Sequence, residues 1–180
     1  MTAKNHLLAA LPREVYEKIA PKLKHVSLER GKILHHPGEA IRDLYFPIDC
    51  AISITITMRD GRTAEAGVIG NREVLGVNAF MGGRETTQTE YIVQIAGSAM
   101  KVDAQTLRDE FDRNKELRDV LLRYTQALIA QISQTTACNR VHSLEQRFAR
   151  WLLEAQDRIE NEELKLTQEF LGDMLGVRRA

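Results

Sequence analysis

Two basic residues close to the end of the sequence have the type and position to read DNA. Arg178 and Arg179 follow Gly176, and Thr167 and Gln168 precede them. Arginine can donate two parallel hydrogen bonds to guanine, whereas short polar side chains commonly bind phosphates. If the pairs begin two successive helices, the arginines can reach base edges and Thr167 and Gln168 can reach phosphates. We expect Arg179 to specify sequence and Arg178 to meet a phosphate or solvent. The alternative is that both arginines are only solvated.

The pattern around these residues predicts the first part of a helix-turn-helix. Thr167 can cap a helix, and Gly176 can end it and supply the turn. Gly172 permits the close approach of a second helix. The helix would have one apolar face, formed by Phe170, Leu171, Met174 and Leu175. Only the first residues of the second helix fall within the sequence, so we expect the 180-residue chain to bind DNA weakly and without sequence preference, if at all.

The composition is typical of a soluble globular protein, with 43% hydrophobic and 28% charged residues and a net charge of zero. No apolar run approaches the roughly 18 residues that span a bilayer, and the N-terminus lacks the apolar core of a signal peptide. The two cysteines, Cys50 and Cys138, stand far apart. These features predict a cytoplasmic protein with free thiols and no membrane partner. From Arg140 onward the net charge is −1, so a basic DNA-binding surface must be local or lie in a continuation of the chain.

The elements that would position these residues change in type along the chain. Residues 7–24 have helical spacing with Pro12 and Pro21 as interruptions. From Val26 to about Val102, short apolar runs alternate with glycines, which predicts a many-stranded β structure. Its clearest strand is residues 52–58, which alternate strictly and lead into the hairpin signal Asp60-Gly61.

A long helical stretch is predicted over about Ala104 to Thr136. Its apolar stripe includes Leu117, Leu121, Tyr124 and Leu128. Two interpretations stay open: a helix that covers only its own β core, or a seam between two chains. We expect the seam, because the helix is longer than a small β domain needs.

A further helix begins at Ser143, where Ser143 and Gln146 match a capping box. The expected domain boundary therefore lies near Cys138–His142. This gives a sensor domain with its dimerisation helix over residues 1–137, and a partial DNA-binding domain over residues 138–180.

In this order, the parts resemble the Crp/Fnr family of bacterial transcription regulators. The matching segments are residues 31–39, 44–46 with 52–58, 143–153 and 166–177. The resemblance implies an α+β fold: an N-terminal β-roll of the double-stranded β-helix or jelly-roll type with flanking helices, a long dimerisation helix, and a partial winged helix-turn-helix. It also implies a homodimer that binds double-stranded DNA, responds to a small-molecule effector and contacts RNA polymerase.

The expected effector pocket departs from the pattern of the cyclic-nucleotide-binding members. Those members place an arginine on the cyclic phosphate, but Thr89 or Glu90 stands at that position here. Arg84 is nearby and is interpreted as a solvated loop charge. We assign Gly76, Phe80, Thr89 and Glu90 to the pocket and expect poor binding of cyclic AMP. No cysteine precedes Cys50, which excludes the four-thiolate cluster of the iron–sulfur members within one chain.

No arrangement of residues predicts catalysis or a cofactor. The sequence has no GxSxG, HExxH or Walker motif, so we do not expect an enzyme. His25, His35 and His36 could suggest metal, but adjacent histidines on a strand point to opposite faces, so we predict none. Cys138 is expected to be a small buried residue, with a redox switch as the alternative. The alternative overall function is a sensor and dimerisation module that does not bind DNA because its reading helix is incomplete.

Overall fold

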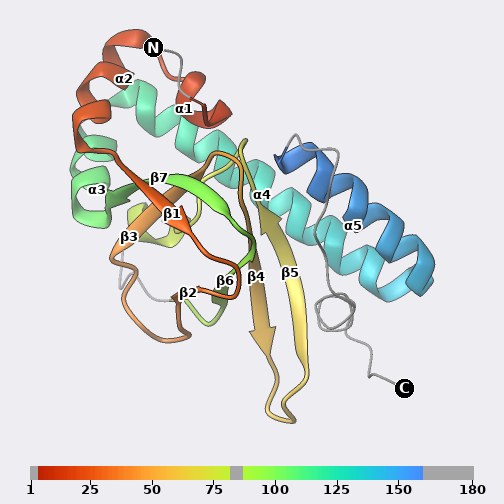
Figure 1. Cartoon of the computed structure of the whole chain (residues 1–180). Coiled ribbons are helices and arrows are strands. Elements are labelled where there is room, and N and C mark those ends of the chain that lie inside the picture. The colour runs from red at the N-terminus through yellow and green to blue at the C-terminus, as the bar shows by residue number, and fades with distance from the viewer. Residues whose placement is uncertain (1–3, 82–86, 160–180) are drawn as a thin grey trace.

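The fold is an α+β arrangement in which two antiparallel sheets form a β-roll flanked by helices (Figure 1). A computed structural model of the chain describes residues 4–81 and 87–159. One sheet has the strand order β1 (Lys24–Leu28), β7 (Gly97–Asp103), β3 (Asp43–Pro47). The other has the order β2 (Ile33–His35), β6 (Glu90–Ile95), β4 (Ala51–Thr57), β5 (Thr63–Ile69). The β-roll and its fold class, as predicted from the sequence, are confirmed.

Strand β7 is the centre of the three-stranded sheet. It pairs with β1, where Lys24 lies opposite Lys101, and with β3, where Asp43 lies opposite Asp103. The first strand of the roll is therefore held by the last one, and every pairing in this sheet joins residues far apart in the chain.

The predicted strand and hairpin are present as β4 and β5. The turn between them closes through a hydrogen bond from the Met58 amide to the Arg62 carbonyl, 2.8 Å long, and Gly61 has a φ of 82°. Alternation places Ile52 and Ile54 in the main core of the roll. Ala51 and Ser53 lie on the other side of the same strand and are also fully buried, so a second element must cover that face.

The N-terminal helical segment is shorter and more interrupted than expected. It consists of α1 (His6–Ala9), α2 (Arg13–Ile19) and the 3₁₀ turn η1 (Ala20–Lys22). Pro12 directly precedes α2 and Pro21 lies within η1, as expected for a residue that cannot donate a backbone hydrogen bond within a helix.

The long helical stretch predicted over 104–136 consists of two helices, α3 (Ala104–Arg113) and α4 (Lys115–Val141). Asn114 separates them with an extended backbone, and its side-chain oxygen accepts a hydrogen bond from the Leu117 amide at 3.0 Å. An asparagine in this position caps a new helix, which explains the interruption.

The four residues expected at a dimer seam are buried in the core of their own chain. Leu117 and Leu121 are 1% exposed, and Tyr124 and Leu128 are 8% and 6% exposed. They belong to the same core cluster as Ile54 of β4. These four therefore cover the chain's own β-roll, which corrects their assignment to an intermolecular contact. The other face of α4 carries Leu122 and Ile129, which are 45% and 58% exposed.

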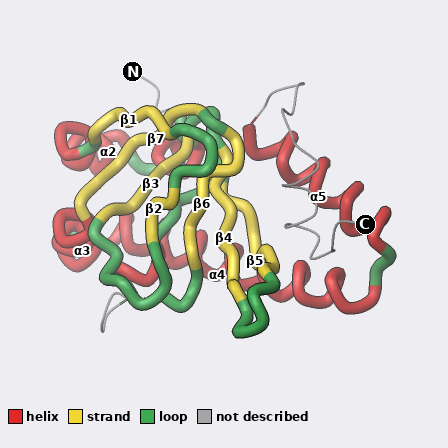
Figure 2. Tube along the Cα trace, turned by 60° about the horizontal axis from the view of Figure 1, so that its bottom comes forward, coloured by secondary structure: helices red, strands yellow, loops and turns green. Residues whose placement is uncertain are grey.

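Helix α5 (Leu144–Ile159) turns back along the roll and covers β4 and β5 (Figures 1 and 2). Its predicted capping box is confirmed: the Ser143 amide donates to the Gln146 side chain at 2.9 Å, and the Gln146 amide donates to the Ser143 hydroxyl at 3.4 Å. Between α5 and the two strands lies a second, smaller apolar cluster, formed by Ala51, Val68, Trp151, Ala155 and Ile159.

Candidate functional site

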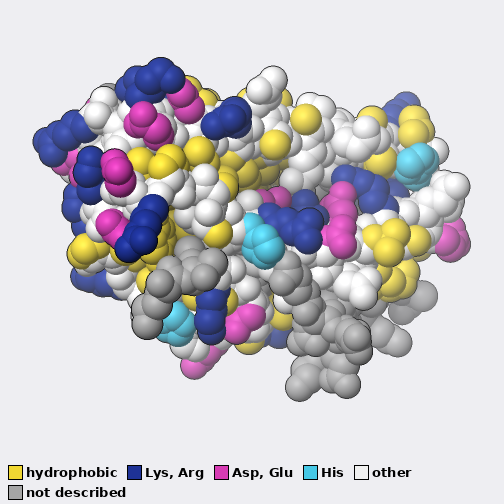
Figure 3. All heavy atoms as spheres, turned by 90° about the horizontal axis from the view of Figure 1, so that it is seen from above, with side chains coloured by type: hydrophobic (Ala, Val, Ile, Leu, Met, Phe, Trp, Pro, Cys, Tyr) yellow, Lys and Arg dark blue, Asp and Glu magenta, His cyan; other side chains and the backbone are white. Residues whose placement is uncertain are grey.

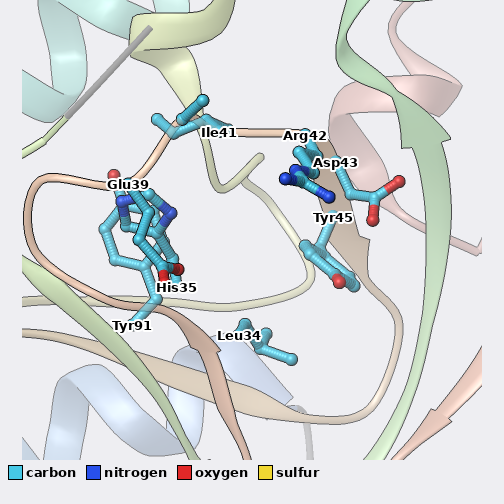
Figure 4. A pocket seen from close by; sticks show the side chains of 9 residues that line it. Leu34, His35, Glu39, Ile41, Arg42, Asp43, Tyr45 and Tyr91 are labelled. Carbon is cyan, nitrogen blue, oxygen red and sulfur yellow. The ribbon is translucent and has the colours of Figure 1, made fainter.

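A cavity of about 550 Å³ opens between the edges of the two sheets (Figure 4). The edge strands β2 and β3 form two of its walls, and residues 36–42, which connect them, form a third. This is a place where side chains of two sheets can converge on one small molecule. The cavity is lined by Leu34, His35, Glu39, Ala40, Ile41, Arg42, Asp43, Tyr45 and Tyr91.

His35 brings a buried and neutral ring to this cavity. Its side chain is 7% exposed, and its Nε2 atom has no hydrogen-bond partner among the residues that the structure describes. Burial is the largest cause that lowers the pKa of His35. The negative charge of Glu39 opposes this shift, and the neighbouring His36 adds to it with a smaller effect. The ring packs at 5.2 Å from the Tyr91 ring. A neutral imidazole with an open nitrogen can donate to a ligand or accept from it.

The opposite side of the cavity carries charge. In Figure 4, Arg42 and Asp43 lie across the cavity from His35, together with Tyr45. Asp43 is held by the Lys101 ammonium at 3.0 Å. Burial, with the nearby Asp43, raises the pKa of Tyr45 to about 12, so its phenol stays protonated. A guanidinium, a phenol and a neutral imidazole around one cavity suit a small polar ligand.

Of the four pocket residues predicted from the sequence, Gly76 borders the cavity wall. Its backbone has a φ of 99°, and a Cβ there would lie 3.1 Å from Leu44 Cγ and 3.4 Å from Ile41 Cγ2. The neighbouring Leu75 exchanges two backbone hydrogen bonds with Tyr45, of 2.8 and 3.3 Å. The segment before Gly76 is therefore fastened directly to a strand that lines the cavity.

The other three predicted pocket residues do not line the cavity. Phe80 is 3% exposed and stacks on Phe111 at 5.1 Å, inside the core. The Thr89 hydroxyl lies 2.6 Å from that of Thr87, and Glu90 lies 3.5 Å from His36 Nδ1. Sequence reasoning missed Arg42, Tyr45 and Tyr91, and it considered His35 only as a metal ligand. Arg84 lies outside the described residues.

Segment 70–76 contacts both of the long C-terminal helices. The Tyr124 hydroxyl of α4 donates to the Val74 carbonyl at 2.9 Å. The carboxylate of Glu73 accepts from the Gly70 amide at 2.6 Å and from Arg158 Nε of α5 at 3.2 Å. One short stretch of backbone thus lies between the cavity wall and both helices.

The predicted DNA-contacting residues Thr167, Gln168, Arg178 and Arg179 lie outside the described residues. Helix α5 leads into the segment that contains them. On the face that Figure 3 shows, basic and acidic side chains are interspersed.

Within the described ranges, no three His, Cys, Asp or Glu side chains converge as a metal site would require. Cys138 is 2% exposed, and its sulfur accepts from Gln134 Nε2 at 3.2 Å. None of the described helices is long and apolar enough to cross a membrane.

Comparisons with known proteins agree with this architecture. Residues 25–114 match the family model described as cyclic nucleotide-binding domain. A comparison with curated protein sequences gives no match. The global regulator CLP of Xanthomonas campestris, a c-di-GMP-responsive protein, has a similar structure, with a TM-score of 0.74, 13% identity, and coverage of 93% of this chain and 86% of that chain.

Two further solved structures have the same fold. FixK2 from Bradyrhizobium japonicum gives a TM-score of 0.73 at 17% identity, covering 86% of this chain and 78% of that chain. A transcriptional regulator of the Crp/Fnr family from Eubacterium rectale gives 0.75 at 16% identity, covering 96% and 80%. The matched residues include the roll, the cavity and segment 70–76, and the chain therefore belongs to the cyclic nucleotide-binding domain family, with the fold of Crp/Fnr regulators.

Proposed function

We propose that this protein is a transcription regulator of Crp/Fnr type, in which the roll binds a small effector and the segment after α5 binds double-stranded DNA. The observation that carries the proposal is the position of segment 70–76. One end of it borders the cavity at Gly76, and its middle is bonded to Tyr124 of α4 and Arg158 of α5. A ligand that moves this segment would change the bonds that the segment makes with both helices, which would couple the cavity to α4 and α5.

The proposed effector site is the cavity between β2 and β3, with His35, Arg42, Tyr45 and Tyr91 as ligand contacts. By the family resemblance, Thr89 or Glu90 takes the place of the arginine that binds the cyclic phosphate in other members, so cyclic AMP is a poor candidate. Glu90 is instead near His36, at 3.5 Å. Calorimetry with millimolar cyclic AMP should give no saturable heat, and a micromolar dissociation constant would contradict this assignment.

We propose that two chains associate through the outer face of α4. The residues first expected there are in the core, but Leu122 and Ile129 lie on the same helix and are exposed. They are seven residues apart, which is two helical turns, so both face one side. Contact with RNA polymerase stays an implication of the family resemblance.

The DNA part of the proposal is tested by a gel shift at physiological salt. The 180-residue chain is compared with a version extended through a recognition helix and wing. We expect weak, unspecific binding by the former and sequence-specific binding by the latter. Replacing Arg179 by alanine in the extended version should cost about 1–3 kcal/mol of discrimination at one base pair.

The control is Arg13→Ala, which removes an exposed arginine paired with Glu17 on α2 and should leave DNA binding unchanged. If the extended version binds no DNA, the second candidate, a sensor and dimerisation module without DNA binding, is favoured. If Arg179→Ala keeps full specificity, Arg179 is not the reading residue.

A further inference from the structure

Helix α5 buries a carboxyl group against the outer face of the β4–β5 pair. Glu65 of β5 is 9% exposed and lies beside the apolar cluster that Trp151 forms with Ala51 and Val68. This cluster is separate from the main core of the roll. The side chain of Glu65 is therefore covered by α5 and not by the folding of the roll itself.

The partners of Glu65 come from both sides of this contact. The Trp151 indole N–H of α5 donates to one carboxyl oxygen at 2.9 Å. The Ser53 hydroxyl of β4 is hydrogen-bonded to the other oxygen. A hydroxyl can donate or accept, so both bonds are compatible with a neutral carboxyl.

The charged groups around Glu65 all come from α5. Arg147, Arg150 and Glu154 line the small space beside it, with the uncharged Thr135 and Asn139 of α4. Arg150 pairs with Glu154 at 2.5 Å, and Arg158 pairs with Glu73 at 3.2 Å and with Glu154 at 3.8 Å. Arg150 and Arg158 therefore pair with the carboxylates of Glu154 and Glu73.

Burial raises the pKa of Glu65 to about 8, although the hydrogen bonds from Ser53 and Trp151 and the charge of Arg158 oppose the shift. Without α5 this face of the sheet would be open to water, and an exposed glutamate has a pKa of about 4.3. Docking of α5 therefore takes up a proton between these two values.

We propose that α5 and the β4–β5 pair form an acid-stabilised latch, closed by the neutral carboxyl of Glu65 between Ser53 and Trp151 and weakened when that carboxyl ionises. The docked state binds more protons than the open one, so its advantage is complete at low pH. The docking constant of α5 falls as pH rises towards 8, by at most about tenfold per pH unit. Since α5 leads to the segment with Thr167 and Arg179, the latch would set the position of that segment; this consequence rests on the proposed function.

Asn71 and Glu73 bind the far end of α5. The Asn71 amide donates to the Arg158 carbonyl at 2.9 Å, and Arg158 binds Glu73. A Glu73→Gln variant removes the partner of Arg158 and a second carboxyl whose pKa burial raises, so it should weaken docking without abolishing the pH-dependent change that Glu65 causes.

The chain contains a single tryptophan, so its emission reports α5 docking directly. We expect the emission of the 180-residue chain to shift to longer wavelength as the pH rises from 5 to 8, with no further shift above about 8. Glu65→Gln keeps an acceptor for Trp151 and a donor for Ser53 without a titrating group, and its emission should stay constant. Glu29→Gln, an exposed change on the β1–β2 connection, is the matched control and should titrate like the parent chain.

Amide hydrogen exchange of the unmutated chain gives a second measurement. After correction for intrinsic rates, residues 144–159 should lose protection as the pH rises from 5 to 8, while residues 104–113 keep theirs. A transition that persists in Glu65→Gln, or constant emission and protection in the parent chain over this range, would overturn the latch. Neither outcome bears on effector or DNA binding, so the proposed function is tested separately.

Discussion

The phenolic oxygen of Tyr124 lies 2.9 Å from the carbonyl oxygen of Val74, and both residues are buried. Burial raises the pKa of Tyr124 well above its ordinary value, so the phenol remains a donor. The bond joins the middle of α4 to the segment that ends beside the cavity. A buried carbonyl at this position has few other ways to be satisfied.

Tyr124→Phe should lower the free energy of unfolding by about 1–2 kcal/mol, because it leaves the Val74 carbonyl without its donor. Urea denaturation followed by circular dichroism measures this. Tyr16→Phe on α2 is the control, since Tyr16 is only partly buried against the core, and it should change stability by less than about 0.5 kcal/mol. Equal effects of the two substitutions would show that the Tyr124 bond contributes nothing.

Gly70→Ala should displace α5 from the roll. A Cβ at Gly70 would lie 2.3 Å from Arg158 Cβ and 2.7 Å from the Arg158 carbonyl oxygen, which real structures do not tolerate. The matched control is Gly67→Ala in β5, the strand that ends directly before Gly70, where the nearest contact would be an ordinary 3.8 Å. Trp151 emission should move to longer wavelength in the first variant alone. Unchanged emission in Gly70→Ala would mean that α5 does not pack here.

Leu122→Glu combined with Ile129→Glu should give folded monomers in sedimentation experiments, because both side chains are exposed on one face of α4. Leu121→Glu with Leu128→Glu should instead unfold the chain, since each places a charge in the core. Leu153→Glu on α5 removes a side chain that is 65% exposed and serves as the control. A dimer that survives the first pair of substitutions would contradict the proposed interface.

Cys50 should be inert in the native protein. It is 0% exposed, its thiol donates to the Ser98 carbonyl at 3.2 Å, and burial beside Asp49 raises its pKa to about 12. At pH 8 only about 10⁻⁴ of such a thiol is ionised, and the thiolate is the reactive form. Ellman's reagent should therefore detect Cys50 only after unfolding in urea. Rapid native labelling of Cys138 would favour the redox alternative for that residue.

The parts of the fold that were predictable from sequence depend on local pattern. Strict alternation marked the β4 strand, and the Ser143–Gln146 pair marked the start of α5. The interruption at Asn114 was missed, although an asparagine before a helical run is a recognisable cap. Which face of α4 is buried could not be derived, because its apolar residues extend around much of the helix.

The cavity depends on contacts between distant residues, which is why sequence reasoning found only its border. His35 comes from β2, Tyr45 from β3 and Tyr91 from β6. No spacing rule links these positions, and their convergence follows only from how two sheets meet. Gly76 could be assigned because it falls in the stretch that corresponds to the expected effector pocket of the cyclic-nucleotide-binding members. The burial of Glu65 by α5 was equally inaccessible, since it requires knowing that the helix turns back.

The central place of β7 has a consequence for how the protein acquires its structure during synthesis. Neither β1 nor β3 has a partner in its sheet until residues 97–103 have been made. Pairings between residues so far apart form slowly, because the intervening chain must first be ordered. Strands β1, β2 and β3 therefore leave the ribosome with open edges, and a chaperone that shields these edges would increase the yield of folded protein.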